Sequence, residues 1–294
     1  MRKKVLSLIL IAILAMGVFA GCAKDETSKT DEPKEGGEKT SESAGKGDLK
    51  DGKYLVKLPV SDHMNYPMAT MEVKDGEITS FDYNEYFAES GEAKNAENYD
   101  YEEGLEVIKN LNKQFMDKKD ADSIDYDAVS GATHTKESFK EIVPALIEKA
   151  EKGEVHEPVY KDGEYEAKAD KDNHGWLPEI KIVVKEGTII GVDFKDVAVE
   201  DMEGEKVVLD EKTKEPVMED DETPKTEPTK VKKGDIKSLE NYSYLPSFDT
   251  IKELTKQIID NDNVENLKLD GISGATNTKD TLLELATKAL ESAK

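Results

Sequence analysis

The chain has 294 residues and carries 65 acidic side chains against 41 basic ones, which gives a formal net charge of −24. This balance argues against nucleic acid as a partner, because its phosphates must be met by lysine and arginine. It argues equally against electrostatic docking on anionic lipid, and a well-solvated surface is the simplest account of the charge. The length suggests two domains of ordinary size.

The N-terminal segment, 1–22, has the pattern of a lipoprotein signal peptide. Basic residues at positions 2–4 precede an apolar run over 5–20, and Phe19-Ala20-Gly21-Cys22 resembles a lipobox. The run is shorter than the roughly 20 residues of a membrane-spanning helix, and small residues end it, as in a cleaved signal. We therefore expect removal of the segment 1–21 and a lipid anchor on Cys22 that holds the protein on the outer face of the cell membrane. The alternative is a short N-terminal transmembrane anchor.

A polar segment follows the lipobox. The stretch 23–50 is rich in Lys, Glu, Ser, Thr and Gly and contains almost nothing apolar to bury. Chains of this composition do not gain enough from burial to fold. We therefore expect a disordered linker over 22–50 between the lipidated cysteine and the first folded domain.

The remainder of the chain contains an internal repeat. Asp51-Gly52-Lys53-Tyr54 returns as Asp162-Gly163-Glu164-Tyr165. Asn98-Tyr99-Asp100-Tyr101 returns as Asn241-Tyr242-Ser243-Tyr244, after a longer interval than the one that separates the first two motifs. The second copy therefore holds an acidic insertion. It fits best in the Lys/Glu/Pro/Thr-rich stretch near 197–233.

Each copy has the same order of predicted elements. Apolar and polar residues alternate over 68–81 and 179–194, and each run is interrupted by Asp-Gly or Glu-Gly, which predicts a hairpin. Helical spacings of three and four follow on both sides of a small-residue loop; Pro144 should kink the helix after the first loop or limit its first part. Strands followed by helices predict an α+β fold of two tandem domains, each a twisted sheet with packed helices, over 51–153 and 162–294 with a linker at 154–161.

The small-residue loop is the most informative motif. The stretch 127–135 reads D-A-V-S-G-A-T-H-T, and the stretch 270–278 reads D-G-I-S-G-A-T-N-T. The Gly and Ala residues allow a phosphate to approach the backbone closely, and a helix N-terminus after the loop offers free N–H groups to its charge. The initial aspartates would be recognised by a modifying enzyme or hold the loop through side-chain-to-backbone bonds. The alternative is a helix-start turn, since Ser and Thr favour N-caps.

The motif Asp-x-x-Ser-Gly-Ala-Thr-x-Thr resembles the site at which a flavin transferase, using FAD and magnesium, attaches FMN to a threonine. Such sites occur in the FMN-binding domains of the Rnf and Nqr electron-transfer subunits. The resemblance extends over most of 51–294. Over this length the chain is similar to the flavinylated, PplA-like lipoproteins of extracellular electron transfer. It implies two covalent FMN groups, on Thr135 and Thr278. The other implied cofactor-binding residues are Asp127, Ser130, Gly131, Ala132, Thr133, Asp270, Ser273, Gly274, Ala275 and Thr276.

The resemblance implies a membrane-anchored electron carrier more than an enzyme. Its partners would be the flavin transferase, a membrane quinol-linked dehydrogenase as donor, and an extracellular acceptor such as ferric iron or a soluble mediator. Dense negative charge near the flavin ring should lower the reduction potential of the flavin, because negative charge disfavours the anionic reduced form. The rival interpretation is a lipoprotein module that binds a solute or partner, with structural SGAT loops. The stretch 14–21 also resembles the small peptides that some lipoprotein signals release as pheromones.

Other repeated residues have weaker interpretations. His63 and His174 occupy equivalent places, but no second ligand at fixed spacing accompanies them, so we expect surface or turn histidines and no metal site. Tyr66 and Trp176 fall one position apart in the two copies and fit core packing better than contact with a flavin ring. For the tyrosines of Asn-Tyr-x-Tyr, burial with a bonded hydroxyl and contact with a flavin remain equal alternatives.

Overall fold

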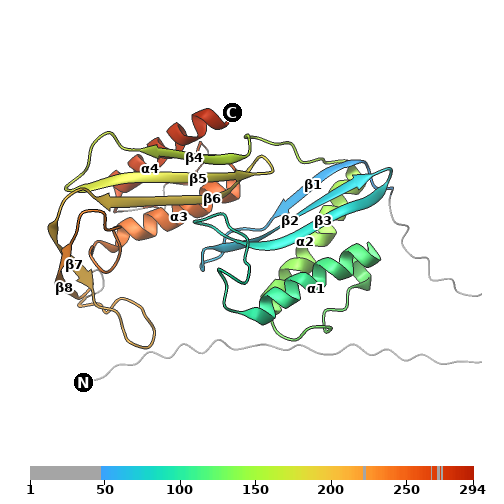
Figure 1. Ribbon diagram of the computed structural model, residues 1–294, viewed down its shortest axis with the longest axis horizontal. Coiled ribbons are helices and arrows are strands. Elements are labelled where there is room, and N and C mark those ends of the chain that lie inside the picture. The colour runs from blue at the N-terminus through green and yellow to red at the C-terminus, as the bar shows by residue number, and fades with distance from the viewer. Residues whose placement is uncertain (1–47, 221–222, 266, 270–271, 273) are drawn as a thin grey trace, which may run out of the picture. The chain divides into compact units, whose positions relative to one another are not determined.

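Two three-stranded antiparallel sheets form most of the β structure (Figure 1). The computed structural model describes residues 48–294 apart from 221–222, 266, 270–271 and 273. The N-terminal sheet has the order β1-β2-β3, formed by Gly52–Lys57, Asn65–Lys74 and Glu77–Phe87. The C-terminal sheet has the order β4-β5-β6, formed by Gly163–Lys168, Trp176–Lys185 and Thr188–Ala198. These last three strands have the same lengths as their N-terminal counterparts and follow them at the interval that separates the two Asp-Gly-x-Tyr motifs.

The two long hairpins turn as their sequences predict. Asp75 and Gly76 between β2 and β3 have φ angles of 53° and 75°, and Glu186 and Gly187 between β5 and β6 have 56° and 69°. Two consecutive left-handed residues match the right-handed twist of the flanking strands, which is why Asp-Gly is favoured here. Each glycine N–H also donates to a carboxylate, that of Asp51 at 2.9 Å and that of Asp162 at 2.7 Å.

Two helices cover each of these sheets. Helices α1 (Glu102–Lys118) and α2 (Thr133–Lys152) contact the N-terminal sheet, and α3 (Leu245–Asn261) and α4 (Thr276–Leu290) contact the C-terminal one (Figure 1). Two short 3-10 turns, η1 (Ala121–Ser123) and η2 (Glu291–Ala293), complete the helical part of the described residues. The predicted α+β class is confirmed in its coarse form, a mixed fold of antiparallel sheets with packed helices.

The cores form where the apolar helix faces meet the sheets. In the N-terminal half, Phe81 and Phe115 lie 4.4 Å apart by ring centroid, and Tyr83 and Phe139 lie 5.1 Å apart at a steep angle, both arrangements that aromatic pairs favour. The larger core cluster contains β5, β6, α3 and α4, and also Tyr66 from β2. The buried Tyr66 hydroxyl donates to the carbonyl of Ile190 at 2.7 Å. Residues on both sides of segment 154–161 therefore share one core.

The inserted stretch contains an additional small sheet. Strands β7 (Met202–Val207) and β8 (Thr226–Val231) pair antiparallel with each other. The polar composition gave no strand signal here, because only Val207 and Val231 of these strands are buried. Val231 joins Trp176 and Ala198 in a small apolar cluster of its own. The insertion thus packs against the start of β5 and the end of β6.

The structure bears on two expectations about local structure. Leu49 packs against the N-terminal core and the Lys50 amide donates to the carbonyl of Ala150 at 2.9 Å, so the end of the predicted disordered linker is held in place. Helix α2 does not end at Pro144 but runs through it to Lys152. Pro144 is exposed, so the carbonyl that loses its helical partner can be solvated.

The part of the chain that the structure describes contains no helix that is both long and apolar enough to cross a membrane. The predicted signal peptide, Cys22 and most of the predicted linker lie outside the described residues.

Candidate functional site

The first SGAT loop leads directly into helix α2. Gly131 and Ala132 have φ angles of 83° and 45°, both left-handed, and the helix begins at Thr133. The first helical hydrogen bond runs from the amide of Lys136 to the carbonyl of Ala132. The N–H groups of residues 133–135 therefore lie in the first turn, outside the helical hydrogen-bond pattern. This is the helix-terminus arrangement that the sequence predicts for phosphate.

A tyrosine hydroxyl holds this loop from the side. The amide of Ala132 donates to the Tyr101 hydroxyl at 3.2 Å. A Cβ added to Gly131 would lie 2.6 Å from that oxygen, so glycine is needed for the close approach as well as for its φ angle. At the second loop, the Tyr244 hydroxyl donates to the carbonyl of Gly274 at 2.5 Å. The second tyrosine of each Asn-Tyr-x-Tyr motif thus contacts the loop.

Thr135, the predicted acceptor in the first loop, is buried against a charged pair. It is only 6% exposed, and its hydroxyl donates to Glu85 Oε1 at 2.6 Å. The other carboxylate oxygen of Glu85 accepts from Lys94 Nζ at 2.6 Å. That ammonium lies 4.2 Å from the ring centroid of Tyr99, where the negative face of the ring attracts it. Thr135, Glu85, Lys94 and Tyr99 form one connected group, named the N-terminal cluster below.

A buried tyrosine completes the surroundings of the N-terminal cluster. The Tyr83 hydroxyl donates to the backbone carbonyl of Thr135 at 3.1 Å. Burial raises the pKa of Tyr83, and the negative charge of Glu85 raises it further. The phenol therefore stays protonated and remains a donor at neutral pH.

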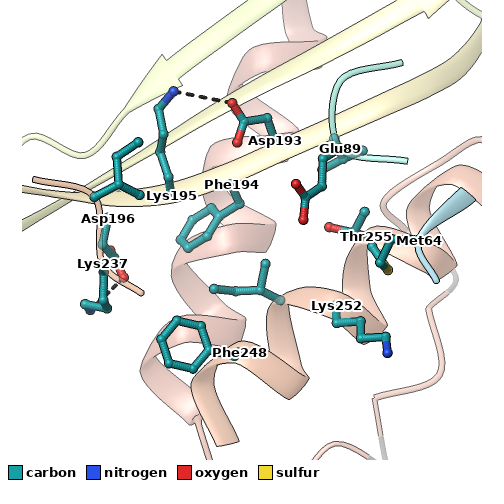
Figure 2. A pocket seen from close by; sticks show the side chains of 13 residues that line it. Met64, Glu89, Asp193, Phe194, Lys195, Asp196, Lys237, Phe248, Lys252 and Thr255 are labelled. Atoms are coloured by element: carbon teal, nitrogen blue, oxygen red, sulfur yellow. Dashed lines mark hydrogen bonds and ion pairs between the residues drawn. The ribbon is translucent and has the colours of Figure 1, made fainter. Parts of the chain in front are cut away.

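The C-terminal half contains an equivalent charged pair (Figure 2). Lys237 Nζ donates to Asp196 Oδ2 at 2.6 Å, and both side chains are largely buried. The ammonium lies 4.4 Å from the ring centroid of Tyr242 and 5.1 Å from that of Trp176. Burial, followed by the charge of Asp196, raises the pKa of Tyr242.

The backbone supports both pairs in the same way. The amide of Lys94 donates to the carbonyl of Glu85 at 2.8 Å, and the amide of Lys237 donates to the carbonyl of Asp196 at 2.9 Å. A side-chain amide closes the following turn in each half: Asn98 donates to the carbonyl of Ala93, and Asn241 does the same at Ile236.

The C-terminal pair forms part of the wall of a cavity of about 350 Å³. The second SGAT loop and the first turn of α4 provide another part of the wall, with Ala275, Thr276 and Thr278. Trp176 and Tyr242 supply aromatic surface. The size falls within the range of sites for small ligands and cofactors, and most of the lining residues are polar.

A second cavity, of about 490 Å³, has the same pair in its wall. Figure 2 shows Phe194, Asp196 and Lys237 in its wall, with Phe248 and Thr255 of α3 around it. The first three of these residues also line the smaller cavity. The Asp196–Lys237 pair and Phe194 therefore border both cavities.

The predicted site residues differ in their exposure to solvent. In the first motif, Asp127, Ser130, Gly131 and Thr133 are exposed, Ala132 is half-buried and Thr135 is buried. In the second, Gly274 and Thr276 are exposed, Thr278 is half-buried and Ala275 is buried. Asp270 and Ser273 lie outside the described residues.

The weaker candidates are also placed. His63 and His174 are exposed, and the described residues include no grouping of three His, Cys, Asp or Glu side chains that could hold a metal. Tyr66 belongs to the core, whereas Trp176 lines the smaller cavity. Tyr99 and Tyr242 are half-buried, and Tyr101 and Tyr244 are exposed, so burial in the core does not explain the repeated tyrosine motif.

The sequence analysis missed the two lysine–carboxylate pairs, although a signal was present. Glu85 and Asp196 are separated by the same interval as the two Asp-Gly-x-Tyr motifs. Lys94 and Lys237 are separated by the longer interval of the two Asn-Tyr-x-Tyr motifs. The insertion therefore begins after Asp196 and ends before Lys237. It separates the members of one pair in sequence without separating them in space.

Comparisons with known proteins add little. The chain matches no family model and no curated protein. Among solved structures, it is similar to the crystal structure of the CPE2226 protein from Clostridium perfringens, with 27% sequence identity and a TM-score of 0.31. The match covers 37% of this chain and 93% of that one. At this TM-score the likeness carries no argument about function.

Proposed function

We propose that the protein is a membrane-anchored electron carrier with two tandem FMN-binding domains and one covalent FMN on each of Thr135 and Thr278. The observation that carries this proposal is the recurrence of one arrangement. In each half, the last threonine of the SGAT motif lies in the first turn of a helix. Thr135 is hydrogen-bonded to the carboxylate of one lysine–carboxylate pair, and Thr278 lines a cavity together with the other pair. The ammonium of each pair lies over the ring of the first tyrosine of Asn-Tyr-x-Tyr.

The residues fit the group. A phosphodiester on the first helical turn would meet free N–H groups and the positive end of the helix dipole. Gly131 leaves room where a Cβ would clash with Tyr101. In the C-terminal half, Trp176, Tyr242 and Lys237 line the cavity beside Thr278, where they would contact an aromatic ring. When bound, FMN supplies one- and two-electron chemistry, and the protein supplies its position and electrostatics.

The local charge at the two sites differs from that of the whole molecule. The chain is acidic overall, yet a buried lysine stands at each proposed site with its carboxylate partner. A lysine paired with a carboxylate adds almost no net charge, so these nearest buried charges do not deepen the negative field that would lower the flavin potential. We therefore infer a smaller lowering of the potential than net charge alone suggests.

The carrier would take electrons from a membrane quinol-linked dehydrogenase and pass them to an extracellular acceptor such as ferric iron. A lipid anchor on Cys22 would keep it at the membrane. Covalent attachment suits that location, because a dissociated flavin would be lost by dilution, whereas a linked one stays at high effective concentration.

The mass of the protein tests this function directly. The segment 23–294 is co-expressed with a flavin transferase in an exporting host, as wild type, Thr135→Val, Thr278→Val and the double variant. We expect mass increments of two, one, one and zero FMN, because valine keeps the shape of threonine but has no hydroxyl. No increment in wild type, with the transferase active on a control substrate, would favour the solute- or partner-binding module instead.

A further inference from the structure

We propose that Glu85 accepts the proton of the Thr135 hydroxyl when FMN is attached, and that Lys94 and Tyr99 hold the carboxylate in place for this step. The inference rests on the proposed function. It assigns to the carrier itself, and not only to the transferase, a group that activates the acceptor.

The geometry gives Glu85 two separate contacts. Its Oε1 accepts from the Thr135 hydroxyl and its Oε2 accepts from Lys94, each at 2.6 Å. The side chains of Glu85 and Lys94 are 12% and 5% exposed, so little water competes for either oxygen. The backbone bond between the same two residues and the ring of Tyr99 fix the ammonium. The carboxylate is therefore held by the lysine through one oxygen and directed at the hydroxyl through the other.

This arrangement suits phosphoryl transfer to a weak nucleophile. A threonine hydroxyl is not acidic, and in protein kinases a carboxylate accepts the proton of the attacking hydroxyl. Here the Thr135 oxygen would attack the phosphorus on the FMN side of the FAD pyrophosphate. A Thr135 O–P bond forms, the P–O bond to AMP breaks, AMP leaves with the electron pair, and the proton passes to Glu85. FAD and magnesium come with the transferase, and nothing is oxidised or reduced.

The same proton transfer makes the product compatible with its surroundings. Once esterified, the Thr135 oxygen has no proton to donate, and its hydrogen bond to Glu85 is lost. An ionised Glu85 would then face an anionic phosphodiester in a buried place, which is costly. A protonated Glu85 avoids that repulsion, and Lys94 beside it carries the compensating positive charge.

The transferase reaches Thr135 only after the chain around it moves, because the residue is 6% exposed. The motif residues before it are only partly packed: Ser130 and Gly131 are exposed and no side chain caps α2, while Val129 and Ala132 contact the core as half-buried side chains. Ala132 is held at a positive φ that is uncommon for a residue with a Cβ. Glu85, in contrast, lies on β3 and is bonded through both side chain and backbone. We expect the loop to move while the carboxylate stays.

The test measures the initial rate of FMN attachment to each threonine separately, by peptide mass mapping with purified transferase, FAD and magnesium. In Glu85→Gln we expect attachment at Thr135 to slow by about 10²-fold, the low end for general base catalysis. The loss should fall on kcat, with the KM for the carrier unchanged. Attachment at Thr278 in the same molecules should keep its wild-type rate, which makes it an internal control for folding and recognition. Glu85→Asp, which keeps a base at a greater distance, should fall between.

A control variant separates the base from the ion pair. Glu85→Gln leaves Lys94 buried without its carboxylate, and an unpaired buried charge by itself destabilises the folded protein. The double variant Glu85→Gln/Lys94→Met therefore removes both charges. We expect the same slow attachment at Thr135 in the double variant; recovery of the rate would show that the stranded lysine caused the loss and would overturn the inference. If Glu85→Gln does not fold, the double variant and Glu85→Asp decide, and an unchanged Thr135 rate in them rejects the role. Wild-type protein that takes up no FMN rejects the proposed function itself.

Discussion

At the scale of single residues, Gly131 is the position where a small change should affect the site most selectively. It has a φ of 83°, and an added Cβ would lie 2.6 Å from the Tyr101 hydroxyl. We expect Gly131→Ala to lower the free energy of unfolding by about 1–2 kcal/mol for the left-handed conformation alone, and more for the clash. It should also slow FMN attachment at Thr135 but not at Thr278.

Gly234 offers a matched control. Its φ is 94°, and an added Cβ would meet nothing within 4 Å. Gly234→Ala therefore has the backbone strain without the clash. Chemical denaturation of both variants, with mass mapping of the two threonines, checks the prediction. Equal loss of stability and unchanged attachment in both would show that Tyr101 moves aside without consequence.

At the scale of elements, the inserted β7–β8 sheet should support the C-terminal cavity through one small cluster. Val231 is 1% exposed and packs with Trp176, which lines that cavity. Val231→Ala shortens a buried branched side chain and should lower the free energy of unfolding by about 2 kcal/mol. Because Trp176 is the only tryptophan, its fluorescence should shift to the red as its surroundings loosen. Lys230 is exposed on the same strand, so Lys230→Ala should change neither the free energy of unfolding nor the Trp176 emission. If Val231→Ala also leaves both unchanged, the insertion does not support the site.

The same element shows how far sequence reasoning extends. The hairpins at Asp75-Gly76 and Glu186-Gly187 were predictable, because a two-residue turn and alternating flanks are local signals. The helices were predictable from their apolar spacing. Strands β7 and β8 were not, because they are polar and bury only one valine each.

The candidate site divides in the same way. The SGAT loops stand out locally as repeated small residues, so their place before a helix could be predicted. For the Glu85–Lys94 and Asp196–Lys237 pairs the sequence contains only the repeated spacing of the single residues. Their pairing follows from the chain folding back onto β3 and β6, which the sequence does not show. The burial of Thr135 also depends on packing between α2 and β3, which one motif does not encode.

At the scale of the whole molecule, the two proposed sites differ in access, and this difference predicts the order in which they are loaded. Thr278 is half-buried and lines an existing cavity of about 350 Å³. Thr135 is 6% exposed, and its hydroxyl is already bonded to Glu85. Glu85 can activate the Thr135 hydroxyl only after the loop has opened. The free energy of that opening therefore lowers the rate of every attachment at Thr135. We therefore expect Thr278 to acquire FMN first when the transferase is limiting.

The single tryptophan reports which site is filled. Trp176 lines the cavity beside Thr278, so a flavin there should quench its fluorescence, whereas a flavin on Thr135 should quench it less. In a time course, the fall in fluorescence should follow the first FMN increment in the intact mass, and the second increment should add little. In Thr278→Val the early fall should disappear, and in Thr135→Val it should remain. If the first increment maps to Thr135, access does not govern loading, and the carboxylate beside Thr135 outweighs its burial.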